Sequence, residues 1–100
     1  MTGIVPPTEL TLAARVAPRE GVLFQQLQDE AVLLNLDSGQ YFGLDEVGTR
    51  IWNLVVEGNA LPQVVSDIVE EYEVDSDRCE ADLLKLLQDL EAQGLVAVTR

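Results

Sequence analysis

The chain has 100 residues, which is enough for one domain and too few for two of ordinary size. Apolar residues make up 47% of it, a share that favours a folded protein over an acidic disordered tail. Acidic residues outnumber basic ones by 18 to 6, which gives a formal net charge of −12, and histidine is absent. The absence of histidine excludes Ser-His-Asp triads and metal sites built on imidazole.

The basic residues are few and scattered, although binding to a phosphate backbone draws on clustered Lys and Arg. Eight acids and one base lie between positions 67 and 82, so this stretch repels nucleic acid and anionic membranes. A cationic or neutral peptide is the better partner. The basic residues are Arg15, Arg19, Arg50, Arg78, Lys85 and Arg100.

The cysteine content and the apolar runs bear on the compartment. The single cysteine, Cys79, cannot form an internal disulfide. The sequence does not open on basic and then apolar residues as a signal peptide does, and its apolar runs are too short to cross a membrane. We therefore expect a cytoplasmic protein that binds neither nucleic acid nor membrane.

The first half of the chain is typical of β-structure. Residues 1–20 combine prolines with a short alternating stretch that fits a strand or an ordered arm. The runs 22–27 and 31–36 are β-compatible, and their spacing indicates a hairpin. Turn-forming residues follow at 37–39, and 40–44 supply a third strand with two adjacent aromatics. The expected product is a three-stranded antiparallel meander.

The second half of the chain has helical periodicity. Asp45 is available as the N-cap of a first helix that ends by Gly58. Residues 61–72 follow the i, i+3, i+4, i+7 pattern of a second helix. A third helix begins near Asp75 or Ser76 and ends at Gln93-Gly94, and a short extended segment closes the chain. Its apolar stripe consists of Cys79, Leu83, Leu86, Leu87 and Leu90.

This order predicts an α+β domain of the winged helix-turn-helix-like type over residues 21–98, preceded by an N-terminal arm or additional strand over 1–20. Such a fold often binds DNA through its third helix. Here that helix carries five acids against Arg78 and Lys85, a net charge of −3 on the surface that must meet phosphate. A winged-helix DNA-binding regulator is therefore disfavoured by charge, and a small non-catalytic subunit of another enzyme is a further alternative.

None of the polar clusters matches a site for chemistry. The acids that begin at Glu73 resemble the opening of a calcium loop, but Arg78 and Leu84 stand where that loop needs glycine and glutamate. Cys79 lies in the apolar stripe without a histidine partner, which is typical of a buried small residue. We therefore expect a protein that is not an enzyme and has no metal site and no cofactor.

The segment from Leu34 to Trp52, LNLDSGQYFGLDEVGTRIW, resembles the PqqD-like family of recognition elements for ribosomally synthesised and post-translationally modified peptides (RiPPs). The run 74–90 and the ending Gly94-Leu95-Val96 are similar to the final helix of the same family. The resemblance covers residues 21–98. Around Tyr41 and Trp52 the sequence is most similar to the stand-alone members found in lasso-peptide pathways.

The resemblance implies a non-catalytic protein that binds the leader of a ribosomally made precursor, here of a lasso peptide. It presents the precursor to a leader peptidase and a macrocyclase. In the family the leader adds as an extra strand to the edge of the third strand and packs into the groove between that strand and the third helix. In such β-augmentation the backbone gives affinity and side-chain pockets give specificity.

The candidate edge, residues 40–44, contains neither proline nor lysine, the usual protection against unwanted pairing. Strand alternation puts Tyr41 and Gly43 on one face and Gln40, Phe42 and Leu44 on the other. One aromatic can therefore line a pocket while the other joins the core, and the sequence leaves open which does which. Trp52 is expected to be a core anchor of the first helix.

On the third helix, Leu84 is apolar but lies more than a quarter turn outside the stripe. If its flank forms the groove, the acids there predict a leader with Lys or Arg near its apolar anchors. The alternative is a single exposed leucine, which is common on protein surfaces. The predicted peptide-binding residues are Gln40, Tyr41, Phe42, Gly43, Leu44, Glu80, Ala81, Leu84, Leu87, Gln88 and Glu91.

Overall fold

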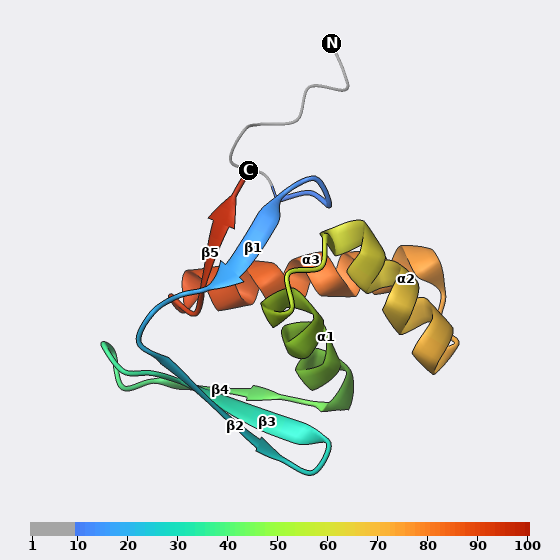
Figure 1. The fold of residues 1–100 in the computed structure, drawn as a ribbon. Coiled ribbons are helices and arrows are strands. Elements are labelled where there is room, and N and C mark those ends of the chain that lie inside the picture. The colour runs from blue at the N-terminus through green and yellow to red at the C-terminus, as the bar shows by residue number, and fades with distance from the viewer. Residues whose placement is uncertain (1–9) are drawn as a thin grey trace.

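The computed structural model describes residues 10–100, so the first nine residues of the predicted N-terminal arm lie outside the described part. The elements and their bounds are β1 (Arg15–Pro18), β2 (Val22–Leu27), β3 (Glu30–Asn35), β4 (Tyr41–Leu44), α1 (Glu46–Val56), α2 (Leu61–Tyr72), α3 (Ser76–Ala92) and β5 (Val96–Thr99). The antiparallel sheet β2-β3-β4 precedes the three helices, which confirms the predicted α+β fold (Figure 1). No helix in residues 10–100 combines the length and apolarity needed to cross a membrane.

Two tight turns build the meander. Between β2 and β3, Gln28 takes a left-handed φ of 60°, as two-residue hairpin turns require. Between β3 and β4, the Oδ1 atom of Asn35 accepts hydrogen bonds from the backbone N–H groups of Asp37 at 2.9 Å and Ser38 at 3.2 Å. This side chain holds the turn in place, so β4 returns antiparallel to β3.

The helix boundaries follow from their caps. The Asp45 side chain accepts a hydrogen bond from Gly48 N at 2.8 Å and starts α1, as predicted. Asp75 does the same for α3, with Arg78 N as the donor at 3.0 Å. Between α2 and α3, Glu73 takes the left-handed conformation, with φ 52° and ψ 44°, and ends α2. The short connection sets α2 beside α3.

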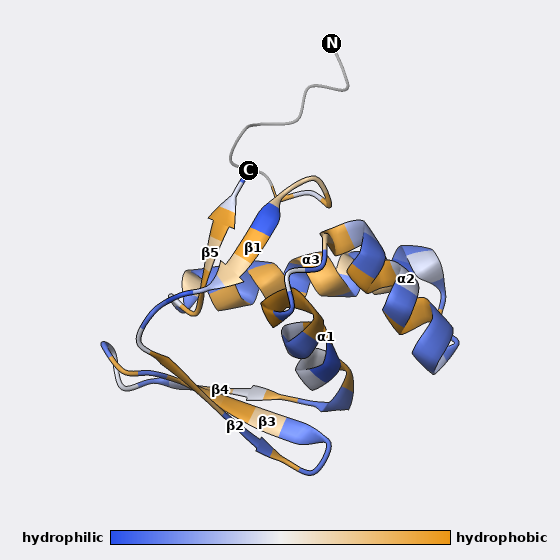
Figure 2. Cartoon of the chain, in the orientation of Figure 1, coloured by the Kyte–Doolittle hydropathy of each residue, from blue (hydrophilic) through white to orange (hydrophobic). Residues whose placement is uncertain are grey.

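The core lies between the helices and one face of the β2-β3-β4 sheet. Leu33 and Leu44 supply its sheet side, and both are buried. Trp52 of α1 is 5% exposed and stacks on Phe24 of β2, with ring centroids 6.2 Å apart, so it is the core anchor that the sequence predicts. Along every helix, apolar residues (orange in Figure 2) alternate with hydrophilic ones, as expected for helices buried on one side.

A second, two-stranded sheet joins the two ends of the described chain. β1 runs antiparallel to β5, with Arg15 opposite Thr99 and Pro18 opposite Val96. Beyond β5, the Arg100 guanidinium donates two hydrogen bonds to the Glu91 carboxylate, at 2.9 and 2.8 Å. These contacts fix the last strand against α3.

Candidate functional site

β4 lies at an edge of its sheet, and within residues 10–100 no strand pairs with its other side. The backbone N–H of Asn35 donates to Gln40 O at 2.9 Å, which identifies the hydrogen-bonded pairs of the β3-β4 ladder. Because these pairs alternate along an antiparallel ladder, the N–H and C=O groups of Tyr41 and Gly43 face the free edge. β4 can therefore accept another strand.

The two aromatic residues of β4 face opposite ways. Phe42 is half-buried, packs against the core and faces the helices, as does the buried Leu44. Tyr41 is 73% exposed on the outer face, in register with Leu34 of the neighbouring strand. Phe42 is therefore the aromatic that lines a pocket, and Tyr41 contributes its backbone to the edge without joining the core.

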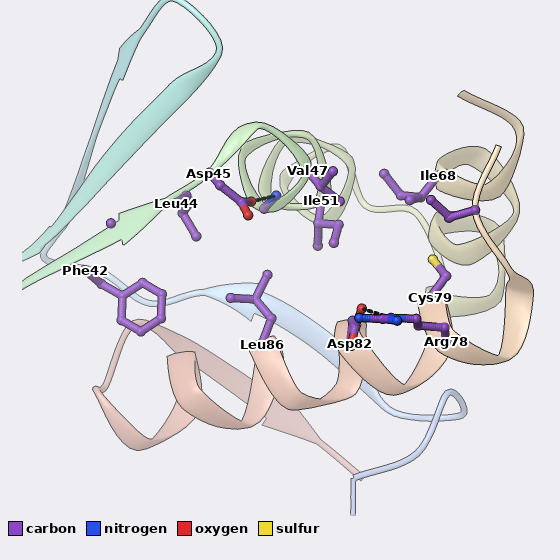
Figure 3. Close-up of a pocket in the computed structure, with 13 residues that line it drawn as sticks. Phe42, Leu44, Asp45, Val47, Ile51, Ile68, Arg78, Cys79, Asp82 and Leu86 are labelled. Atoms are coloured by element: carbon purple, nitrogen blue, oxygen red, sulfur yellow. Dashed lines mark hydrogen bonds and ion pairs between the residues drawn. The ribbon is translucent and has the colours of Figure 1, made fainter. Parts of the chain in front are cut away.

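A groove of about 570 Å³ opens beside β4, between the start of α1 and one flank of α3 (Figure 3). Phe42 and Leu86 lie at the same end of it, Leu44, Val47 and Ile51 line the α1 side, and Cys79 lies toward Ile68. Most of the surface is apolar. The lining residues are Phe42, Gly43, Leu44, Asp45, Val47, Gly48, Ile51, Ile68, Val74, Arg78, Cys79, Asp82 and Leu86.

The α3 wall of this groove is not the flank that was predicted to contact the peptide. The wall consists of Arg78, Cys79, Asp82 and Leu86, which lie on the flank opposite Leu84, because Asp82 and Leu84 are separated by about 200° around the helix. The residues predicted for this wall and absent from it are Glu80, Ala81, Leu84, Leu87, Gln88 and Glu91. Among these, Leu87 is fully buried, Leu84 packs half-buried on the core, and Glu91 pairs with Arg100.

Periodicity locates the apolar stripe of α3 but treats its two edges alike. Leu86 lies at one edge, next to Asp82, and Leu87 lies at the other, toward Leu84. The sequence places Leu86 in the core, whereas the structure leaves it half-buried in the groove. Only the docking of α3 on the rest of the fold decides which edge meets β4, so no local feature of the sequence separates the two flanks.

The groove provides surface and charge rather than reactive groups. Burial, followed by the charge of Asp82, raises the pKa of the Cys79 thiol, so this side chain stays protonated at neutral pH. Arg78 Nε lies 3.7 Å from Asp82 Oδ2, and both side chains are mostly exposed. Within residues 10–100, no group of three or more His, Cys, Asp or Glu residues is placed to hold a metal ion.

Gly48 keeps the α1 side of the groove compact. A Cβ atom at this position would lie 3.2 Å from the capping Oδ1 of Asp45 and 3.3 Å from Leu44 Cδ2. Such a side chain would disturb the cap that starts α1. Because Gly48 has no side chain, β4 can turn directly into α1. The free strand edge and the groove therefore adjoin, and together they fit an extended peptide.

Two solved structures share this fold. A structure titled "TbiB1 in Complex with the TbiA(beta) Leader Peptide" is 41% identical, with a TM-score of 0.76 over 80% of this chain and 93% of that one. Another, titled "Lasso peptide synthetase B1 complexed with the leader peptide", is 25% identical, with a TM-score of 0.77 over 83% of this chain and 98% of that one.

No curated protein matches the sequence. The family described as "Coenzyme PQQ synthesis protein D (PqqD)" matches residues 30–96, which is more than half of the chain. The same span contains the β3-β4 hairpin, the free edge, the groove and all three helices. The chain therefore belongs to the PqqD family.

Proposed function

We propose that this protein binds the leader of a ribosomally synthesised precursor peptide, as a RiPP recognition element of the lasso-peptide type. The observation that carries the proposal is the free edge of β4 directly beside an apolar groove. Two similar solved structures are described as complexes with leader peptides, and one of them is 41% identical to this chain.

In this proposal the leader adds to β4 as a further strand of the sheet. The outward backbone groups of Tyr41 and Gly43 pair with it, which gives affinity that depends little on its sequence. Alternate leader side chains point into the groove and contact Phe42, Leu44 and Leu86, which gives selectivity. The 21–98 domain thus contains the whole binding site.

The protein's contribution is then binding rather than catalysis. Held at its leader, the precursor keeps its core segment free for a leader peptidase and a macrocyclase of the same pathway. The binding takes place in the cytoplasm, where ribosomally made precursors first appear.

Substitution of Gly43 tests the pairing directly. A proline at position 43 removes the N–H that faces the free edge and leaves the ladder to β3 intact, because Phe42 and Leu44 hold the inward groups. We expect Gly43→Pro to weaken binding of the leader about tenfold, which corresponds to the loss of one backbone hydrogen bond of about 1.4 kcal/mol. Calorimetric titration with the TbiA(beta) leader peptide, which is bound in the 41%-identical structure, measures the change.

Gly43→Ala is the matched control. A Cβ at this position meets no atom within 4 Å, and the N–H is retained, so the affinity should stay within about twofold of the parent. Amide shifts at residues 40–44 during the same titration report the edge itself. Equal affinities for both variants, or unperturbed amides at saturating leader, would rule out strand addition at β4.

A further inference from the structure

Three charged side chains line the groove, and they are not equally free to meet a ligand. The Asp45 carboxylate caps α1 through Gly48 N at 2.8 Å. Among residues 10–100, the Asp82 carboxylate has only Arg78 as its ion-pair partner, at 3.7 Å, and the two side chains are 72% and 82% exposed. An exposed ion pair of this kind contributes little to stability, and its members exchange partners readily. Asp82 is therefore the carboxylate in the groove that a ligand can engage.

The charge around the groove favours a basic ligand. Asp45 and Asp82 outnumber Arg78 on its walls, and the whole chain has a formal net charge of −12. A carboxylate brought to Arg78 would have to displace Asp82 and enter this negative field. A Lys or Arg brought to Asp82 gains from the same field during approach and in the complex.

The spacing along α3 fits an extended chain. Leu86 and Asp82 are four residues apart, so they follow each other along one flank at about 6 Å. In an extended peptide, side chains two residues apart point the same way at about 6.6 Å. Figure 3 shows Phe42 beside Leu86, with Asp82 next along α3. A peptide that runs along this flank with one side chain on Leu86 and Phe42 therefore has its second neighbour near Asp82.

We infer that Asp82 selects leaders in which a Lys or Arg lies two residues from the apolar side chain that packs on Phe42 and Leu86. This inference rests on the proposed leader-binding function and adds the chemistry of the preferred leader to it. The selecting residue is on the flank that carries Leu86, not on the Leu84 flank that the sequence favoured. Arg78 competes with the ligand for Asp82.

The first test is a selection from a phage-displayed library of random dodecapeptides. The parent protein should enrich peptides with Lys or Arg two residues from a large apolar residue. Asp82→Lys should enrich Asp or Glu at that position instead. Glu80→Lys makes the same change in charge on an exposed residue of α3 outside the groove, so it should keep the parent's preference.

The outcomes of the selection separate the two claims. Enriched apolar peptides without a charge pattern, or a pattern unchanged in Asp82→Lys, would overturn the inference and leave the proposed function intact. A charge pattern that changes with Glu80→Lys and not with Asp82→Lys would also overturn it. Failure of the folded parent protein to enrich any peptide would count against both.

Affinities of a synthetic pair provide the second test. The pair consists of one selected peptide and the same peptide with its basic residue replaced by Gln. The basic peptide should bind about 2- to 5-fold more tightly to the parent, and the preference should vanish in Asp82→Asn. Arg78→Gln should strengthen binding of the basic peptide, because Asp82 loses its competing partner. Weaker binding to Arg78→Gln would show that Arg78 contacts the ligand, contrary to the inference.

Discussion

Phe42 and Tyr41 are neighbours in sequence with separate functions in the proposed complex. Phe42 gives its ring to the groove, while Tyr41, 73% exposed on the far side, gives only its backbone to the edge. Truncation of the Phe42 ring should therefore change which peptides bind, whereas truncation of the Tyr41 ring should change this much less. Because successive side chains of a strand point to opposite faces, one residue can provide selectivity while its neighbour provides backbone pairing.

Glu73 has a backbone conformation that lowers the stability of the fold, and its substitution by glycine should remove this cost. It ends α2 in the left-handed conformation, with φ 52°, which glycine adopts without the clash of a Cβ. We expect Glu73→Gly to raise the free energy of unfolding by about 0.5–1 kcal/mol, measured by urea denaturation. Glu70→Gly is the control within the helix, and there the same change should lower stability by about 1 kcal/mol. Equal losses in both variants would contradict this account.

At the scale of elements, the sheet is held to α1 by the stack of Phe24 on Trp52. Phe24 is 36% exposed, so its removal forfeits part of the burial of a core phenylalanine together with the ring contact. We expect Phe24→Ala to lower the free energy of unfolding by about 2 kcal/mol. Denaturation followed by Trp52 fluorescence measures this loss.

Leu27→Ala is the control on the same strand. Leu27 is 65% exposed, so its truncation should cost less than about 0.5 kcal/mol. A loss as large as that of Phe24→Ala would mean that the hairpin is held by its outer face rather than by the stack.

Elements defined by neighbouring residues could be predicted from the sequence. Asp45 caps α1 and Asp75 caps α3 because each bonds to a backbone N–H three residues ahead, so both signals are local. The pairing of Arg15 with Thr99 joins residues far apart in the sequence and has no local signal. The sequence therefore left open whether this segment forms an arm or a strand. The flank of α3 that lines the groove has no local signal either, because helical periodicity cannot tell the Leu86 edge of α3 from the Leu84 flank.

At the scale of the whole molecule, acidic residues far outnumber basic ones, so repulsion among carboxylates dominates the electrostatics. Eighteen acids face six bases, and some of the ion pairs in residues 10–100 are exposed, as between Lys85 and Asp89. Arg50 of α1 holds the pKa of Glu71 of α2 below its ordinary value through a side-chain hydrogen bond. Such exposed pairs offset little of the mutual repulsion among the remaining carboxylates.

Added salt should therefore stabilise the fold. We expect the melting temperature, followed by circular dichroism, to rise when NaCl increases from about 0.02 to about 0.3 M, because repulsion is screened over distances near the Debye length. Glu80→Lys makes the formal net charge less negative and should show a smaller rise. A melting temperature that falls with salt would mean that the exposed ion pairs outweigh the repulsion.

The β1-β5 ribbon also has a consequence for how this domain can be used. Because Arg15 lies opposite Thr99, the chain enters and leaves the described domain side by side, at the end away from the β2-β3-β4 sheet (Figure 1). A longer polypeptide can therefore be joined at either end without covering β4. The domain is suited to gene fusion at either end, and to circular permutation through a short linker across the ribbon.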